Sequence, residues 1–246
     1  MASTSETGNA KNVANFQDLV AFVTAYGLTY NPSKSALKLP QLAVLYTAAQ
    51  ATLADVITKN TAFNGKVNER VIAFSNLRPL ATRLISALQT TDATPQKVAD
   101  AKTFNKKIQG VRATPLPATG GVPDPNTPAP TTISTSQQSF DQQIQHFAGI
   151  IAVLQSETSY TPNETELKIV TLTAKLTDLT DKNNAVSTAY ATISNSRIAR
   201  DTTLYGTDTG LFDIASEIKK YVKSVFGTSS PQFAQVKGIA FLKKKI

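Results

Sequence analysis

Two long stretches of the chain carry apolar residues at heptad spacing, and this pattern restricts the fold more than any other feature. It is typical of long helices packed side by side. A helix of about 40 residues would be about 60 Å long, so we expect one such helix in each stretch. The first set is Leu42, Tyr46, Ala49, Leu53, Val56, Asn60, Phe63, Val67, Arg70, Phe74 and Leu77. The second set is Leu172, Leu176, Leu179, Asn183, Val186, Tyr190, Ile193, Arg197, Arg200 and Leu204.

The two stretches belong to segments of sequence that resemble each other. Tyr30-Asn31-Pro32 and Tyr160-Thr161-Pro162 are each followed by Leu-Lys and a further Leu at the same spacing. Thr94-Pro95-Gln96 recurs as Ser230-Pro231-Gln232 at a larger separation, which indicates a small insertion around 206–210. Fixed spacing of this kind is the signature of an internal repeat. We therefore predict a tandem duplication.

The duplication predicts an all-α chain with a four-helix unit in each copy. Residues 12–110 form helical repeat 1 and residues 136–246 form helical repeat 2. Residues 1–11 are expected to be a flexible N-terminus, and 111–135 a Pro/Thr-rich linker, because proline lacks the amide donor that a helix requires. The two copies could form separate four-helix bundles, or their long helices could pack together in one elongated helical bundle. The long heptad pattern favours the second arrangement.

Local signals place the remaining helix ends. A first helix is expected from Val13 to Tyr26, before Gly27, and its counterpart begins at Phe140. Third helices are expected from Pro79, and from Leu211 to Phe226 before Gly227. Fourth helices are expected after Pro95 and Pro231, the latter passing into a less regular end.

The start of the second long helix carries its own signal. Thr161 is a good N-cap, Pro162 fits the first helical position, and Glu164 completes a capping box. In the first copy we expect Pro40 to delay the helix start.

The chain lacks the residues that most catalytic and metal sites need. It has no Cys, which excludes disulfides and thiolate chemistry, and a single histidine, His146, which is more typical of a structural residue than of a catalytic base. A calcium loop starting at Asp201 fails because Tyr205 and Phe212 occupy ligand positions. We therefore expect no catalytic residue, no metal, no cofactor and no small-molecule substrate, and interpret the protein as not an enzyme.

Polar residues interrupt the heptad pattern at Asn60, Arg70, Asn183, Arg197 and Arg200. Buried polar groups destabilise a fold unless they are paired, and they can fix helix register. A structural role is favoured over a catalytic one.

Clusters of lysine are the positive functional signal. The net charge is +8 and the isoelectric point is near 9.6. Such clusters can contact phosphates, but they also solubilise helix ends. The candidate anion- or partner-binding residues are Lys102, Lys106, Lys107, Lys219, Lys220, Lys223, Lys243, Lys244 and Lys245.

The N-terminal residues are polar and resemble no signal peptide, and no apolar run approaches the roughly 20 residues that span a bilayer. We expect a cytoplasmic protein without membrane insertion.

Two segments of the sequence resemble an uncharacterised family of bacterial duplicated helical proteins of similar length. They run from Tyr30-Asn31-Pro32 to Leu42 and from Lys220 to Gly227. The resemblance implies the duplication and brings no activity or ligand with it.

These patterns together predict a non-catalytic structural or protein-interaction protein, a scaffold or an assembling subunit, with a protein partner or self-association. The alternative is a nucleic-acid- or ribosome-associated basic helical protein.

Overall fold

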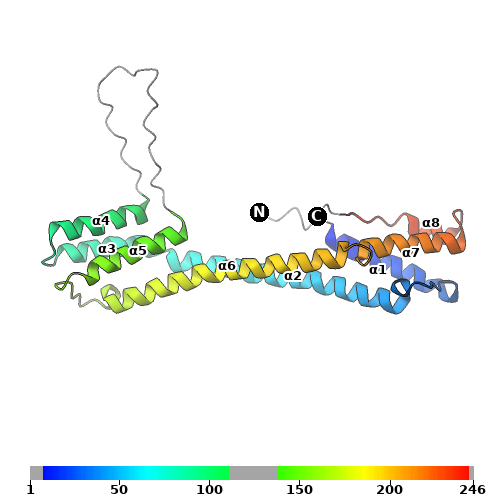
Figure 1. The fold of residues 1–246 in the computed structure, drawn as a ribbon, viewed down its shortest axis with the longest axis horizontal. Helices are drawn as coiled ribbons and strands as arrows, with labels where there is room; N and C mark the ends of the chain where they lie inside the picture. The colour runs from blue at the N-terminus through cyan, green and yellow to red at the C-terminus, as the bar shows by residue number, and fades with distance from the viewer. Residues whose placement is uncertain (1–7, 111–137, 244–246) are drawn as a thin grey trace, which may run out of the picture. The chain divides into compact units, whose positions relative to one another are not determined.

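A computed structural model describes residues 8–110 and 138–243. The regular secondary structure of these residues is helical, with no β-strand among them. The expectation of an all-α chain is confirmed (Figure 1). The α-helices are α1 (Asn9–Ala25), α2 (Leu39–Phe74), α3 (Leu77–Gln89), α4 (Pro95–Gln109), α5 (Phe140–Gln155), α6 (Ile169–Tyr205), α7 (Leu211–Phe226) and α8 (Pro231–Lys237). Three short 3-10 helices are η2 (Gly27–Thr29), η3 (Ser35–Leu37) and η4 (Thr165–Leu167).

The two long helices have nearly equal lengths, with 36 residues in α2 and 37 in α6. Pro40 does not delay α2. It lies in the first turn, where a missing amide donor leaves no hydrogen bond unmade. Most heptad positions are buried or half-buried. Tyr190 is the exception, because it is 59% exposed although its ring lies 6.0 Å from that of Phe63.

The chain divides into two compact units that do not follow the predicted repeats. Unit 1 comprises 1–64 and 189–246, and unit 2 comprises 65–188. Each long helix contributes residues to both units. Unit 1 takes α1 from the first half of the sequence and α7 and α8 from the second, whereas unit 2 takes α3 and α4 from the first half and α5 from the second. A separate bundle built from one repeat alone is therefore not what the chain forms.

The core of unit 1 lies where α1, α7 and α8 contact one another. Phe16 and Leu19 on α1 are fully buried, as is Ile218 on α7. These helices also cover the start of α2 and the end of α6, since Leu42 and Leu204 belong to the same apolar cluster. Unit 1 is thus held together by residues from opposite ends of the sequence.

The core of unit 2 has the same set of contacts, with α5, α3 and α4 in the places of α1, α7 and α8. Phe147 and Ile150 on α5 are fully buried, as is Leu84 on α3. Gly149 on α5 lets α4 approach closely, because an added Cβ would lie 2.6 Å from the Phe104 ring. The two units therefore use equivalent helices for equivalent contacts.

The connection that leads into each long helix is fixed by a buried tyrosine. The Tyr30 hydroxyl donates to the Leu37 carbonyl at 2.8 Å, and the Tyr160 hydroxyl donates to the Leu167 carbonyl at 2.9 Å. Burial raises the pKa of both phenols, that of Tyr160 to about 12. Each hydroxyl therefore remains protonated and able to donate at neutral pH.

This tyrosine contact explains why the predicted capping box at Thr161, Pro162 and Glu164 is wrong. These residues lie in the connection, η4 follows them, and α6 begins only at Ile169. The Tyr160 bond and the buried Leu167 side chain hold the segment in a compact turn. A hydrogen bond within the connection therefore accompanies a turn where the local signal predicted a helix start.

The flexible N-terminus was predicted too long, because α1 already begins at Asn9. The Tyr205 hydroxyl donates to the Asn9 side chain at 2.6 Å, and Asn12 exchanges two hydrogen bonds with the backbone of Leu242. These contacts order the first turn of α1. Residues 1–7 and the predicted linker 111–135 lie outside the described residues.

In the first half, α3 begins at Leu77 and not at the expected Pro79, so the last predicted heptad residue lies in α3 and not in α2. The ends of α7, α4 and α8 agree more closely with expectation. The α7 helix spans Leu211–Phe226, and Gly227 follows it with a positive φ of 90°. Thr94 and Ser230 cap α4 and α8, each accepting a backbone N–H. The end of the second half is less regular, since α8 stops at Lys237 and residues 238–243 are not helical.

Cutting the full chain at a protease site placed between Gly120 and Gly121 should leave one particle. Each unit contains helices from both sides of the cut, so that separating the pieces would expose both apolar cores. Size-exclusion chromatography with light scattering checks this, with the uncut chain as the control. Pieces that separate without denaturant would contradict the composition of the units.

Replacing Tyr160 or Tyr30 with Phe should lower the free energy of unfolding by about 1–3 kcal/mol, because each change leaves a buried carbonyl unpaired. Urea unfolding measures the loss. Tyr190→Phe is the matched control, since this exposed hydroxyl makes no hydrogen bond with the described part of the chain, and its effect should be close to zero. Equal effects for the three variants would remove the role assigned to the buried hydroxyls.

Candidate functional site

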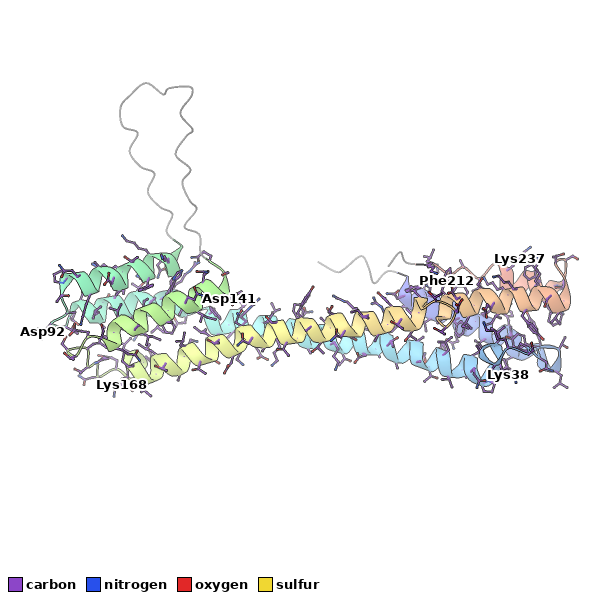
Figure 2. All side chains as sticks on the ribbon, in the orientation of Figure 1. Lys38, Asp92, Asp141, Lys168, Phe212 and Lys237 are labelled. Carbon is purple, nitrogen blue, oxygen red and sulfur yellow. The ribbon has the colours of Figure 1, made fainter. Side chains whose placement is uncertain are left out.

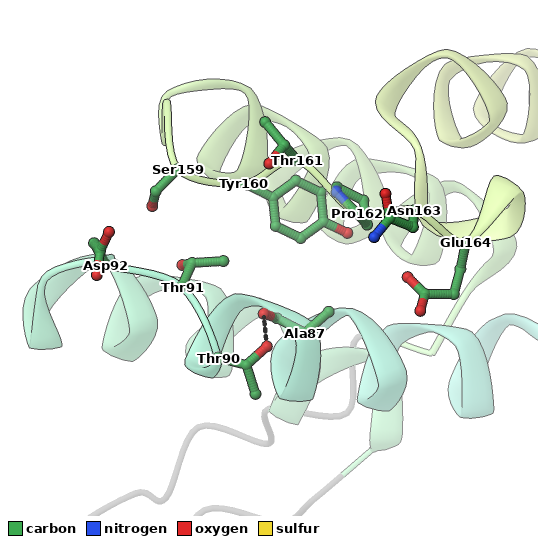
Figure 3. A pocket seen from close by; sticks show the side chains of 10 residues that line it. All are labelled: Ala87, Thr90, Thr91, Asp92, Ser159, Tyr160, Thr161, Pro162, Asn163 and Glu164. Carbon is green, nitrogen blue, oxygen red and sulfur yellow. Dashed lines mark hydrogen bonds between the residues drawn. The ribbon is translucent and has the colours of Figure 1, made fainter.

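A pocket of about 330 Å³ opens in unit 2 between the end of α3 and the connection from α5 to α6 (Figure 3). One wall comes from α3 and the loop after it, and the other wall comes from the residues around the buried Tyr160. The lining residues are Ala87, Thr90, Thr91, Asp92, Ser159, Tyr160, Thr161, Pro162, Asn163 and Glu164. Sequence reasoning did not anticipate this pocket.

Several hydroxyls of the pocket already have partners that shape its walls. Thr90 donates to the Ala87 carbonyl at 2.8 Å, as the dashed line in Figure 3 shows, and Thr91 donates to the Leu88 carbonyl at 2.7 Å. The Ser159 hydroxyl donates to Glu157 at 2.7 Å. These bonds hold the walls, so that the free polar groups of the pocket lie elsewhere.

Glu157 holds the pocket wall around Tyr160 in place through several hydrogen bonds. Hydrogen bonds from the Ser159 hydroxyl and amide, with a further bond from Lys97 on α4, lower the pKa of its carboxyl to about 2. The Lys97 ammonium also donates to the Ser156 carbonyl at 2.7 Å. The connection after α5 is therefore fastened to α4 by a charged contact.

The groups that remain free to meet a ligand are acidic or neutral. The side chains of Asp92, Asn163 and Glu164 make no hydrogen bond with the described residues, and all three are exposed. Asp92 lies in the loop between α3 and α4 (Figure 2). As exposed carboxylates, Asp92 and Glu164 are in contact with solvent.

A second hollow of about 460 Å³ adjoins the first along α3. The two share Ala87, Thr90 and Glu164, and the second adds Arg83, whose guanidinium pairs with Glu166 at 2.6 Å. Open space therefore lies on either side of the small Ala87 side chain.

The candidate lysines of unit 2 lie on α4. Lys102 and Lys106 are exposed, and Lys107 is half-buried. None of the three makes an ion pair within the described residues. They remain candidate anion-binding residues.

The candidate lysines of unit 1 have mixed environments. Lys220 and Lys223 on α7 are exposed. Lys219 donates to the Ile239 carbonyl and lies 5.1 Å from the Phe241 ring centre, and burial lowers its pKa. Lys243 lies 3.7 Å from Asp213 and 5.4 Å from the ring centre of Phe212, which Figure 2 labels at the start of α7. Lys244 and Lys245 lie outside the described residues.

Among the polar heptad residues, Arg70 and Asn183 act together in unit 2. The Arg70 guanidinium donates to Asn183 at 3.1 Å and lies 4.1 Å from the centre of the Phe140 ring. Asn183 in turn donates to Asp141 in the first turn of α5 at 2.7 Å. This chain of contacts ties α2, α6 and α5 together in one register, in agreement with the structural role expected for both residues.

Arg200 in unit 1 is the largest fully buried side chain of the described part. Its guanidinium pairs with Asp201 at 2.8 Å. Burying an arginine is tolerable only with such pairing, and the contact uses Asp201, one of the residues of the rejected calcium loop. Asp213, just beyond the end of that loop, accepts the Asp208 amide at 3.1 Å.

His146 is buried on α5, with its ring centre 6.4 Å from that of Phe104. Burial, with the nearby charge of Lys107, lowers its pKa. Its Nε2 atom has no hydrogen-bond partner among the described residues. The histidine is thus a buried residue of unit 2 that packs beside Phe104.

A search of the described residues finds no cluster of His, Cys, Asp or Glu suited to a metal ion. Within the same residues, no helix combines the length and the apolarity needed to cross a bilayer. Comparisons with protein-family models, with curated proteins and with solved structures find no match to this chain.

Acidification should destabilise the protein through His146. Its pKa is below the unfolded value of 6.5, so its contribution to stability is complete above that pH and decreases as the pH falls. His146→Leu should flatten the dependence of unfolding free energy on pH between about pH 8 and pH 5. Urea unfolding across that range measures the effect. Parallel curves for wild type and variant would show that another group titrates.

Proposed function

We propose that this protein is a non-catalytic structural or protein-interaction protein, a scaffold that presents two similar helical units on one pair of long helices. The observation that carries the proposal is the composition of the units. Each one takes helices from both halves of the sequence and repeats the other's contacts. Such an arrangement provides two related surfaces on a single chain.

The proposal includes the tandem duplication, and the buried residues support it. Leu77, Leu80, Ala81, Leu84 and Leu88 on α3 match, in order and spacing, Leu211, Ile214, Ala215, Ile218 and Val222 on α7. In α1 and α5, the buried Phe16 matches Phe147 better than Phe140. The insertion expected around 206–210 corresponds to a longer loop before α7, since only residues 75–76 separate α2 from α3.

Each unit also has an ion pair between its connection and one of its shorter helices. Lys34 pairs with Glu217 on α7 at 2.6 Å, and Arg83 on α3 pairs with Glu166 at 2.6 Å. Arg83 and Glu217 occupy matching positions of their helices. On the side of the connection the partners lie two residues apart, because the register that pairs Tyr30 with Tyr160 places Lys34 at Glu164 and Ala36 at Glu166. The contact between connection and helix is kept in both units while the sign of each charge is reversed.

The alternative function, association with nucleic acid or the ribosome, rests on the exposed Lys102, Lys106, Lys220 and Lys223. Lys219 and Lys243 support it less, because their ammonium groups already contact the protein. A phosphate contact at these two positions would have to replace an existing interaction.

Size-exclusion chromatography with light scattering on the untagged chain, at low and high salt, tests the two functions. We expect a defined species without nucleic-acid absorbance at either salt concentration. The chain has no Trp and 7 Tyr, so that bound nucleic acid would be conspicuous. A nucleic-acid peak at low salt that disappears at high salt would overturn the proposal in favour of phosphate binding, which weakens steeply with salt.

A further inference from the structure

The pocket beside Ala87 has an occupied counterpart in unit 1. The matching of buried residues on α3 and α7 places Ala87 at the position of Tyr221. The connections also match, because Tyr30 and Tyr160 make the same hydrogen bond to a carbonyl of the adjacent 3-10 helix. The same position, beside the same kind of connection, therefore carries a large phenol in unit 1 and a methyl group in unit 2.

In unit 1, the Tyr221 side chain contacts the connection in two ways. Its ring meets the edge of the Tyr30 ring at 5.3 Å with an interplanar angle of 89°, a favourable geometry for an aromatic pair. The Asn31 amide donates to its hydroxyl at 3.2 Å. The phenol of Tyr221 thus packs against the Tyr30 ring and accepts a hydrogen bond from the backbone.

In unit 2 the position of Tyr221 carries Ala87, and Tyr160 is 6% exposed. Tyr160 lines the pocket, and open volume lies on both sides of Ala87. The Thr161 amide, which corresponds to Asn31, donates to the Ser159 carbonyl two residues earlier at 3.1 Å. A turn this tight is a weak arrangement for a hydrogen bond, so a phenol oxygen could replace it.

The chain itself offers no ring from its undescribed segments. Residues 1–7, 111–137 and 244–246 contain no Phe, Tyr or Trp. These segments therefore supply no aromatic side chain to the pocket.

We infer that the pocket beside Ala87 binds the tyrosine side chain of a partner protein, in the place that Tyr221 fills in unit 1. This inference deepens the proposed interaction function and rests on it. The partner's phenol ring would meet the edge of Tyr160, and its hydroxyl would accept from the Thr161 amide. Asp92 and Glu164, at the rim, would favour neutral or basic residues beside the tyrosine.

A titration of the full chain with p-cresol, followed by amide chemical shifts, tests the pocket. We expect shifts at Ala87, Thr90 and Thr91 and from Tyr160 to Glu164, with a dissociation constant on the order of 1 mM. N-acetyl-tyrosinamide should shift the same residues. No shift at the pocket with p-cresol would overturn the inference, and shifts with p-cresol but not with N-acetyl-tyrosinamide would overturn the tyrosine as occupant.

Three variants make the result specific. Ala87→Tyr should fill the pocket with a tethered ring and abolish the p-cresol shifts. Ala99→Tyr, at an exposed position of α4 outside the pocket, is the matched control and should leave them unchanged. Tyr221→Ala should create a new p-cresol site near Tyr30. Unchanged shifts in Ala87→Tyr would overturn the assignment even if Tyr221→Ala fails to fold.

The outcome is separate from that of the function test. Chromatography reports assembly and nucleic-acid binding without any phenol, so failure of the titration would remove the pocket and leave the structural function standing. A nucleic-acid peak with a positive titration would instead remove the function and leave a ring-binding pocket.

Discussion

The structure depends on a constraint common to all amphipathic helices, because an apolar stripe must be covered by another stripe. The α1 helix presents Phe16 and Leu19, and its cover is α7, almost two hundred residues away along the chain. The α5 helix finds its cover on α3 and α4, which precede it. Because both halves of the sequence contribute to each core, neither unit is complete without helices from both.

The polar contacts then give each unit one arrangement. The tyrosine hydroxyl that fastens each connection is buried and specific, and it fixes where the following long helix starts. Each unit also has an ion pair between connection and helix, Lys34–Glu217 in unit 1 and Arg83–Glu166 in unit 2, and the acidic and basic residues are on opposite sides in the two units. Exposed pairs of this kind contribute little stability. Complementarity between their partners matters more there than the identity of either residue.

Much of the helical content could be predicted from the sequence because its signals are local. Pro95, Pro231 and Gly227 mark helix ends through backbone chemistry alone, and heptad spacing shows which face of a long helix is covered. Heptad spacing does not show which segment covers that face. The presence of helices from both halves in each unit could therefore not be predicted. The capping box at Thr161 was wrong for another reason, because the hydrogen bond from Tyr160 to the Leu167 carbonyl lies within a turn where the helix was expected to start. The pocket was missed because a small side chain, Ala87, leaves no pattern in a sequence.

The composition of the units has a consequence for the order of folding during synthesis. Unit 2 is one continuous stretch, 65–188, so all of its residues are synthesised before α7. Domains fold as units as they emerge, and unit 2 can therefore form early. Unit 1 must bring α1 together with α7 and α8, a closure across almost the whole chain that carries a larger entropic cost. The apolar face of α1 is thus the last to be covered, and it is the surface that a nascent-chain chaperone would meet.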